Sequence, residues 1–398
     1  MQKICVVGLG YIGLPTASFL GTKGYDVWGV DVDPKVVDLI NQGTNHIAEP
    51  GLDVLVKSAV QSGQLTAGLE PQPADIFILA VPTPFRDGYQ PDLSYIDAAV
   101  KSILPHVAKG NLIILESTVP VGTTDDSVAA GLMASGLAIG EDLFVAHCPE
   151  RVLPGKILTE FVENDRIVGG INEDSTEMAA AFYEEFVSGE VLRTNAATAE
   201  MSKLFENTYR DVNIALANEL SIIGDLQGVD PWDVIEMANR HPRVNIHQPG
   251  PGVGGHCIAI DPWFVVAGAP KEARLIRMAR EVNDAKPDWV IEKVKAKAGK
   301  FKNPKIACLG LTYKADVDDL RESPAEKIVQ RLKAENVGEI LVADPNIQSH
   351  PDFDLVDFET AVAQSDVVLL LVEHRPFKRL KARDLHEKIL IDTRGIFR

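Results

Sequence analysis

The chain has 398 residues, 45% of them hydrophobic and 24% charged, which is enough for two or three domains with their own cores. Its formal net charge of -18 disfavours nucleic acid as a partner, because a polyanion would be repelled. No leader-like N-terminus or membrane-spanning apolar run is present, so we expect a cytoplasmic protein with no membrane partner. A reducing compartment would keep its four cysteines as thiols.

The first half of the chain alternates apolar, β-rich runs with segments of helical period. The runs lie at 3–7, 27–31, 75–81, 111–116 and 143–147. This alternation is typical of βα units around a parallel sheet. We therefore predict a Rossmann-like α/β domain over residues 1–195.

The rest of the chain divides into a helical part and a second α/β part. Long helical patterns occupy 199–226 and 272–298, and strand-like runs resume at 305–314, 339–345, 366–374 and 389–395. The prediction is a central helical domain over 196–300 and a second Rossmann-like parallel-sheet domain over 301–398.

A glycine-rich turn follows the first predicted strand. Gly8, Gly10 and Gly13 have the GxGxxG spacing, in which the glycines allow a tight turn, approach to a pyrophosphate and close helix packing. Asp31 ends the next strand, where a carboxylate binds a ribose 2′-hydroxyl and repels a 2′-phosphate. These residues predict an NAD site, with Asp33 as a less favoured ribose ligand.

Four more residues are expected to contact this cofactor. Tyr11 and Ile12 lie inside the glycine turn, and Thr83 and Thr118 follow the strands at 75–81 and 111–116. The carboxyl ends of parallel strands meet at one edge of a sheet, so both threonines should reach the cofactor crevice. The alternative is that they only satisfy backbone groups of their own turns.

The helical pattern at 199–220 has an apolar stripe and a polar face. The stripe consists of Met201, Leu204, Phe205, Val212 and Leu216. Lys203, Asn207 and Arg210 stand at i, i+4 and i+7 and share another face. These three are candidate substrate ligands, unless their face is only solvated.

Cys257 lies in the glycine-rich segment PGPGVGGHCIAIDPW. A thiolate nucleophile needs access and nearby donors, which glycine amides and Lys203 could supply. Cys5, Cys148 and Cys308 lie in or at the end of apolar runs and fit the alternative role of inert core residues. Adjacent His–Cys pairs lack metal-ligand spacing, so no metal is expected.

Two further loops carry charged candidates. Glu150 and Arg151 follow the run at 143–147, where Glu150 either handles a proton or caps the next helix. Lys314 and Arg321 lie in the loop at 312–325, where they would bind a diphosphate unless this loop is only a solvated, charged one.

These segments together resemble the UDP-glucose/GDP-mannose dehydrogenase family. The resemblance is carried by the glycine turn, CPERVLPG, EMSKLFENTYRDVNIALANEL, PGPGVGGHCIAIDPW and KADVDDLRESPA, in the family's order and over nearly the whole chain. CPERVLPG and RHPRVNIHQPGPGVGGHCIAIDPWF are most similar to members acting on UDP-N-acetyl-D-mannosamine. The resemblance implies NAD-dependent, four-electron oxidation of a UDP-sugar at C6 by a homodimer that forms through the helical middle.

The resemblance also implies roles for individual residues. Cys257 would attack the C6 aldehyde to give a thiohemiacetal, whose oxidation yields a thioester. Lys203 and Asn207 would stabilise the oxyanions at C6, and Asp261 would position or activate the hydrolytic water. Glu150 and Thr118 would lie beside the reacting carbon and its water.

The remaining residues implied by the resemblance contact the nucleotides. Lys314 would bind substrate, Arg321 would lie at the cofactor and the domain interface, and Arg243 would reach the substrate from a partner subunit. The other substrate-binding candidates are Arg151, Val152, Arg210 and His256.

The chain departs from UDP-glucose members around the sugar. A lysine is lost beside the nucleophile, where this chain has Ile260 before Asp261, and Arg151 begins a segment unlike the usual one after Glu150. Both changes favour an N-acetylated hexose, with UDP-N-acetylglucosamine or another UDP-hexose as the alternative. A two-electron hydroxyacid dehydrogenase and a non-catalytic NAD-binding protein also stay open.

Overall fold

A computed structural model describes residues 2–47, 49–86, 88–153, 155–255 and 257–397. Its contacts divide the chain into two compact units, Met1–Phe205 and Glu206–Arg398. The domain boundaries predicted at 195 and 300 stay a prediction.

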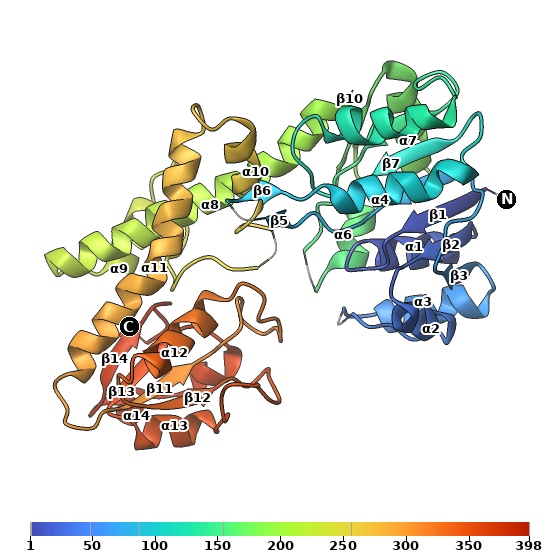
Figure 1. The fold of residues 1–398 in the computed structure, drawn as a ribbon. Coiled ribbons are helices and arrows are strands. Elements are labelled where there is room, and N and C mark those ends of the chain that lie inside the picture. The colour runs from blue at the N-terminus through green and yellow to red at the C-terminus, as the bar shows by residue number, and fades with distance from the viewer. Residues whose placement is uncertain (1, 48, 87, 154, 256, 398) are drawn as a thin grey trace. The chain divides into compact units, whose positions relative to one another are not determined.

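The first unit is built on an eight-stranded sheet in the order β10-β9-β8-β7-β4-β1-β2-β3 (Figure 1). Its strands are β1 (Lys3–Val7), β2 (Asp26–Val30), β3 (Leu65–Gly68), β4 (Ile76–Leu79), β7 (Leu112–Leu115), β8 (Phe144–His147), β9 (Arg166–Gly170) and β10 (Val191–Asn195). Neighbouring strands are parallel except β8 and β9, which pair antiparallel. The predicted α/β fold is thereby confirmed.

The five strands predicted for this unit are present within one or two residues of their expected bounds. Strands β4 and β7 are fully buried, as their unbroken apolar runs indicate. The sequence did not predict β3, β9 and β10. Strand β3 alternates buried and more exposed residues, β9 begins with an arginine and ends with two glycines, and β10 has only one buried residue, Val191.

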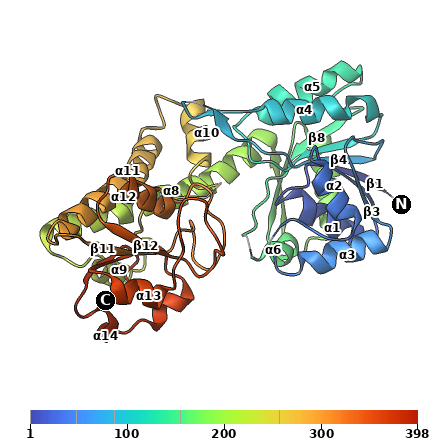
Figure 2. The ribbon, with the colours of Figure 1, turned by 60° about the horizontal axis from the view of Figure 1, so that its bottom comes forward.

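Helices cover both faces of this sheet, with α4 and α5 on one side and α1, α3 and α6 on the other (Figure 2). The helices of the unit are α1 (Gly13–Thr22), α2 (Pro34–Asn41), α3 (Leu52–Gln61), α4 (Ser94–Ile103), α5 (Ala130–Leu132), α6 (Ile157–Glu163), α7 (Glu173–Glu184) and the start of α8 (Ala196–Gln227). A short hairpin is formed by β5 (Phe85–Arg86) and β6 (Gln90–Pro91).

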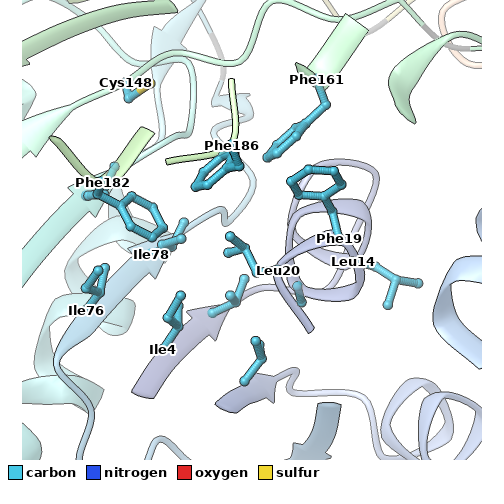
Figure 3. Close-up of a cluster of buried hydrophobic side chains, with 14 of the residues drawn as sticks. Ile4, Leu14, Phe19, Leu20, Ile76, Ile78, Cys148, Phe161, Phe182 and Phe186 are labelled. Carbon is cyan, nitrogen blue, oxygen red and sulfur yellow. The ribbon is translucent and has the colours of Figure 1, made fainter. Parts of the chain in front are cut away.

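An aromatic cluster fixes α1, α6 and α7 on one face of the sheet (Figure 3). The rings of Phe19 and Phe161 have centroids 5.0 Å apart, and those of Phe182 and Phe186 are 5.2 Å apart. These rings pack with Ile4 and Ile78 of the central strands. The packing leaves the loops at the carboxyl ends of the parallel strands to form the site.

The second unit contains a four-stranded parallel sheet in the order β12-β11-β13-β14. Its strands are β11 (Lys305–Leu309), β12 (Glu339–Ala343), β13 (Val367–Leu370) and β14 (Ile389–Asp392). Besides the rest of α8, its helices are α9 (Pro231–Ala238), α10 (Asp261–Gly268), α11 (Arg274–Ala298), α12 (Pro324–Ala334), α13 (Phe358–Gln364) and α14 (Ala382–Leu385). Helices α12 and α13 lie on opposite sides of β11 and β12 (Figure 1).

Both long helical patterns predicted for the middle of the chain are confirmed, as α8 and α11. The apolar stripe predicted on α8 is only partly a core, because Leu204 is buried whereas Met201, Phe205 and Leu216 are exposed. No helix in the described ranges is long and apolar enough to cross a membrane.

Candidate active site

The glycine turn between β1 and α1 has the geometry expected of a dinucleotide site. Gly8 has a φ of +94°, which favours glycine, and its amide donates to the Val30 carbonyl at 2.8 Å. A Cβ at Gly13 would lie 1.8 Å from the Gly8 carbonyl oxygen, whereas a Cβ at Gly10 would meet nothing within 4 Å. The turn is therefore tight on the protein side and open at Gly10, where a pyrophosphate would approach.

Asp31 is held at the end of β2 against this turn. Its carboxylate accepts hydrogen bonds from the amides of Leu9, at 3.1 Å, and Asp33, at 2.9 Å. Asp33 instead caps α2 by accepting from the amide of Lys35 at 2.9 Å. Asp31 thus lies against the glycine turn whereas Asp33 lies at the start of α2, and the role of Asp31 as the ribose ligand stays a prediction.

Tyr11 is exposed and Ile12 is half-buried immediately before α1. Thr83 and Thr118 lie together, because the Thr83 hydroxyl donates to the Thr118 carbonyl at 2.6 Å. This bond joins two loops that are 35 residues apart, so it is not the local turn contact that the sequence left open as the alternative, and the cofactor role of both threonines stays a prediction. Both threonines are half-buried.

Glu150 is a buried carboxylate three residues after the end of β8. It accepts from Nη1 of Arg166 at 2.9 Å and from the amide of Arg151 at 2.7 Å. It does not cap α6, because Glu49 accepts from the amides of Gly155 and Ile157 at that helix start. The alternative role of Glu150 as a helix cap is therefore wrong.

The segment after Glu150 contains the two other predicted ligands. Val152 is half-buried, and Nη1 of Arg151 donates to the Asp165 carbonyl at 2.9 Å. This contact holds the Arg151 side chain against the loop before β9.

The turn of α8 that carries Lys203 is held against the 122–124 loop by Glu200, three residues earlier. Glu200 is buried and accepts from the amides of Gly122, at 2.6 Å, and Thr124, at 2.8 Å, in the loop that follows Thr118. Burial lowers the pKa of His147 to about 3, and the positive charge of Lys203 adds to this effect. Lys203 therefore lies close to the end of β8, the strand that Glu150 follows.

In the second unit, Asn207, Cys257 and Asp261 form one group. The Asn207 amide donates to the Asp261 carboxylate at 2.6 Å, and both side chains are buried. The Asp261 amide donates to the Cys257 carbonyl at 2.9 Å, so Cys257 lies one turn before α10 begins. A helix N-terminus favours an anionic sulfur.

Cys257 is exposed, in contrast to the other three cysteines, which are buried. Burial raises the pKa of Cys5 to about 11 and the pKa values of Cys148 and Cys308 to about 12. Burial thus keeps these three thiols protonated, and the reactivity of Cys257 stays a prediction. Among the described residues, no group of His, Cys, Asp and Glu has a metal-binding arrangement.

The glycines before Cys257 also have a packing role that the sequence did not reveal. A Cβ at Gly254 would lie 2.5 Å from the Glu322 carbonyl oxygen, and one at Gly255 would lie 2.9 Å from the Tyr313 ring. The Gly255 amide donates to the Arg321 carbonyl at 3.2 Å. The cysteine loop therefore packs directly on the loop at 312–323.

The other predicted ligands of this unit are exposed. Lys314 and Arg321 lie in the 312–323 loop, where Arg321 forms a 2.6 Å ion pair with Asp319. Arg210 and Arg243 are also exposed, so Arg210 does not share the burial of Asn207 one turn away. His256 lies outside the described residues.

Sequence reasoning missed three charged residues whose side chains hold the loops that carry the predicted site residues. Arg166, Glu49 and Glu200 each bind a site loop from a distant part of the chain. In the sequence these residues are visible only as charged residues inside or beside a β-rich or helical pattern. Such a pattern does not show which distant loop the charged side chain will bind.

Comparison with known proteins relates three segments to the UDP-glucose/GDP-mannose dehydrogenase family. The matches are its NAD binding domain over residues 2–187, its central domain over 197–285 and its UDP binding domain over 307–398.

Individual relatives match over the full length. An NDP-N-acetyl-D-galactosaminuronic acid dehydrogenase of Ralstonia nicotianae is 54% identical, with 100% of this chain and 96% of the relative covered. A UDP-N-acetyl-D-mannosamine dehydrogenase of Campylobacter jejuni is 52% identical, with 94% and 96% covered. The solved structure of a UDP-N-acetyl-mannosamine dehydrogenase from S. aureus is 46% identical, covers 100% of this chain and 96% of its own, and has a TM-score of 0.92.

Proposed function

The chain belongs to the UDP-glucose/GDP-mannose dehydrogenase family and is an NAD-dependent UDP-sugar dehydrogenase, and we propose that it oxidises UDP-N-acetyl-D-mannosamine at C6 to UDP-N-acetyl-D-mannosaminuronate. Such a uronate is a building block for acidic surface polysaccharides. The names of the relatives support an N-acetylated sugar but differ in its configuration. UDP-N-acetylglucosamine, UDP-N-acetylgalactosamine and other UDP-hexoses are therefore the alternatives.

The observation that carries the proposed chemistry is the exposed Cys257 one turn before α10, beside the bonded pair Asn207 and Asp261. NAD, when bound at the glycine turn, accepts one hydride in each of two oxidations. The Cys257 sulfur adds to the aldehyde carbon between them, which gives a thiohemiacetal and then a thioester. The thioester keeps the intermediate on the protein.

Hydrolysis of the thioester releases the carboxylate and restores the thiol. Water adds to the thioester carbon, the carbon–sulfur bond breaks, and one proton is released. Asp261 positions this water, while Lys203 and Asn207 stabilise the oxyanions at C6. Glu150 and Thr118 lie beside the reacting carbon, and Glu150 accepts a proton. In total, one alcohol, two NAD⁺ and one water give one carboxylate, two NADH and three protons.

Nucleotide binding completes the proposal. Gly8, Gly10, Tyr11, Ile12, Gly13, Asp31, Thr83 and Arg321 bind NAD, and Arg151, Val152, Arg210, Lys314 and His256 bind the UDP-sugar. In a homodimer formed through the central helices, Arg243 reaches the substrate of the partner subunit.

The test is the number of NADH molecules formed per UDP-sugar at completion. UDP-N-acetylmannosamine, UDP-N-acetylglucosamine, UDP-N-acetylgalactosamine and UDP-glucose are compared side by side. We expect two NADH per sugar and the highest kcat/KM with the first. One NADH per sugar would contradict the thioester mechanism. Turnover with only one of the other sugars would make that sugar the substrate in place of UDP-N-acetylmannosamine.

A substitution at the nucleophile separates this chemistry from a two-electron dehydrogenase. Cys257→Ala is expected to lower steady-state turnover by at least about a thousandfold, because no thioester forms. Cys308→Ala, which removes a buried thiol in the same unit, is the matched control and should keep turnover. Normal turnover of Cys257→Ala would refute the proposed mechanism.

A further inference from the structure

A second buried glutamate lies behind Glu150, in a cluster that the mechanism above does not use. Glu116 directly follows β7 and is 1% exposed. Its carboxyl accepts from the Tyr183 hydroxyl of α7 at 2.8 Å and from the Thr16 hydroxyl of α1 at 3.3 Å. The side chain is thus fixed inside the sheet–helix interface.

A buried cation, Arg166, joins Glu150 to this cluster. Arg166 of β9 is 2% exposed, and its Nη1 forms the 2.9 Å ion pair with Glu150 while its Nη2 donates to the Phe161 carbonyl at 3.3 Å. Its guanidinium also lies over the rings of Phe161, at 4.4 Å, and Tyr183, at 5.3 Å. The cluster is neutral when Glu116 is protonated and carries one negative charge when both glutamates are ionised.

The charge of this cluster changes near neutral pH. Burial, reinforced by the negative charge of Glu150 and opposed by Arg166, raises the pKa of Glu116 to about 7. The neighbouring titratable groups keep their protons, because burial raises the pKa of Cys148 to about 12 and that of Tyr183 well above its usual value. Glu116 is therefore protonated below this pH and becomes ionised above it.

We propose that Glu116 is a positioning residue that acts on Glu150 through the buried cluster they share, because the Tyr183 hydroxyl donates to Glu116 while the Tyr183 ring lies under the guanidinium that is paired with Glu150. When Glu116 loses its proton, its negative charge attracts the Arg166 guanidinium and repels the negative charge of Glu150. Glu150 then becomes the stronger base for the protons released during oxidation and hydrolysis. This inference rests on the role proposed for Glu150.

The test compares pH profiles of the wild type and Glu116→Gln. We expect kcat of the wild type to rise across a step near pH 7 and the step to be absent from the variant. The ratio of variant to wild-type kcat should therefore fall several-fold, up to about tenfold, between pH 6 and pH 8.5, with little change in KM. The same step in both proteins would overturn the inference.

Two further variants separate a charge effect from a packing defect. Glu116→Asp keeps a carboxyl and should keep a step. Tyr183→Phe removes a hydrogen bond to the ionised form and should move the step to higher pH. If all three variants lost turnover equally at every pH, Glu116 would be only structural.

A spectroscopic titration tests the inference without turnover, so its failure is distinct from failure of the proposed function. The infrared band of a protonated carboxyl, taken as wild type minus Glu116→Gln, should disappear as the pH rises through about 7. A carboxylate band already at pH 5 would overturn the inference even if two NADH form per sugar.

Discussion

At the residue scale, two glycines of the turn after β1 have different roles, one in folding and the other in cofactor binding. Gly13 is needed by the protein itself, because any side chain there would overlap the Gly8 carbonyl. Gly10 faces open space and is needed only for the ligand. An alanine at Gly13 should therefore lower the stability of the fold, whereas an alanine at Gly10 should weaken NAD binding and leave the stability unchanged.

We expect Gly13→Ala to cost about 2 kcal/mol or more of stability, because the helix must move away from the strand. Gly10→Ala should leave the thermal unfolding midpoint within about 2 °C of the wild type but weaken NAD binding at least about tenfold. Differential scanning calorimetry and calorimetric titration with NAD measure the two effects. Equal losses of stability in both variants would show that Gly10 is also structural.

At the element scale, a buried ionic network joins α8 and α11 beneath the cysteine loop. Arg280 of α11 forms a 2.6 Å ion pair with the fully buried Asp211 of α8 and also binds Asp284. Nη1 of Arg280 approaches the Ile258 carbonyl at 3.5 Å, and Asn283 donates to Asp211 at 2.8 Å. Two helices and the residue after Cys257 thus depend on one guanidinium.

Arg280→Met is expected to cost about 3–5 kcal/mol, because it leaves Asp211 buried without its cation. The double variant Asp211→Asn/Arg280→Met should recover most of this loss, since the unpaired charge is removed as well. Thermal unfolding of the single and double variants measures both effects. An additive loss in the double variant would show that the ion pair itself is not the source of the effect.

At the scale of the whole molecule, the exposed apolar face of α8 supports the proposed homodimer. Met201, Phe205, Leu216 and Ile223 are between 42% and 56% exposed and recur at helical spacing. An apolar stripe of this length on a charged protein is typical of an interface between subunits.

Leu216→Glu combined with Ile223→Glu should convert a dimer into monomers, because four charges would be buried at a two-fold interface. Light scattering coupled to size exclusion measures the mass, which we expect to halve. Val54→Glu on α3, another exposed apolar position, is the matched control. If Arg243 acts across the dimer, kcat/KM of the double variant should fall as its mass halves. If the double variant stays a dimer, the subunit interface lies elsewhere.

The sequence by itself determined the features that depend on local geometry. The order of the strands along the chain follows from hydrophobic periodicity, and the glycine turn with Asp31 follows from short spacings and from the φ values that glycine allows. All of these are properties of residues near one another in the chain. The contrast between Cys257 and Cys5 could be predicted for the same reason, because one lies among glycines and the other inside an apolar strand.

Only the tertiary structure decided which distant residues became partners. From the sequence, Glu150 either handled a proton or capped the next helix, and nothing indicated that the antiparallel pairing of β8 and β9 would bring Arg166 to it. The glycines before Cys257 were expected to supply donors to its thiolate, but Gly254 also packs against the loop that carries Glu322. A buried charge needs a partner, but its own neighbours in the chain do not specify where that partner comes from, so the fold must supply it.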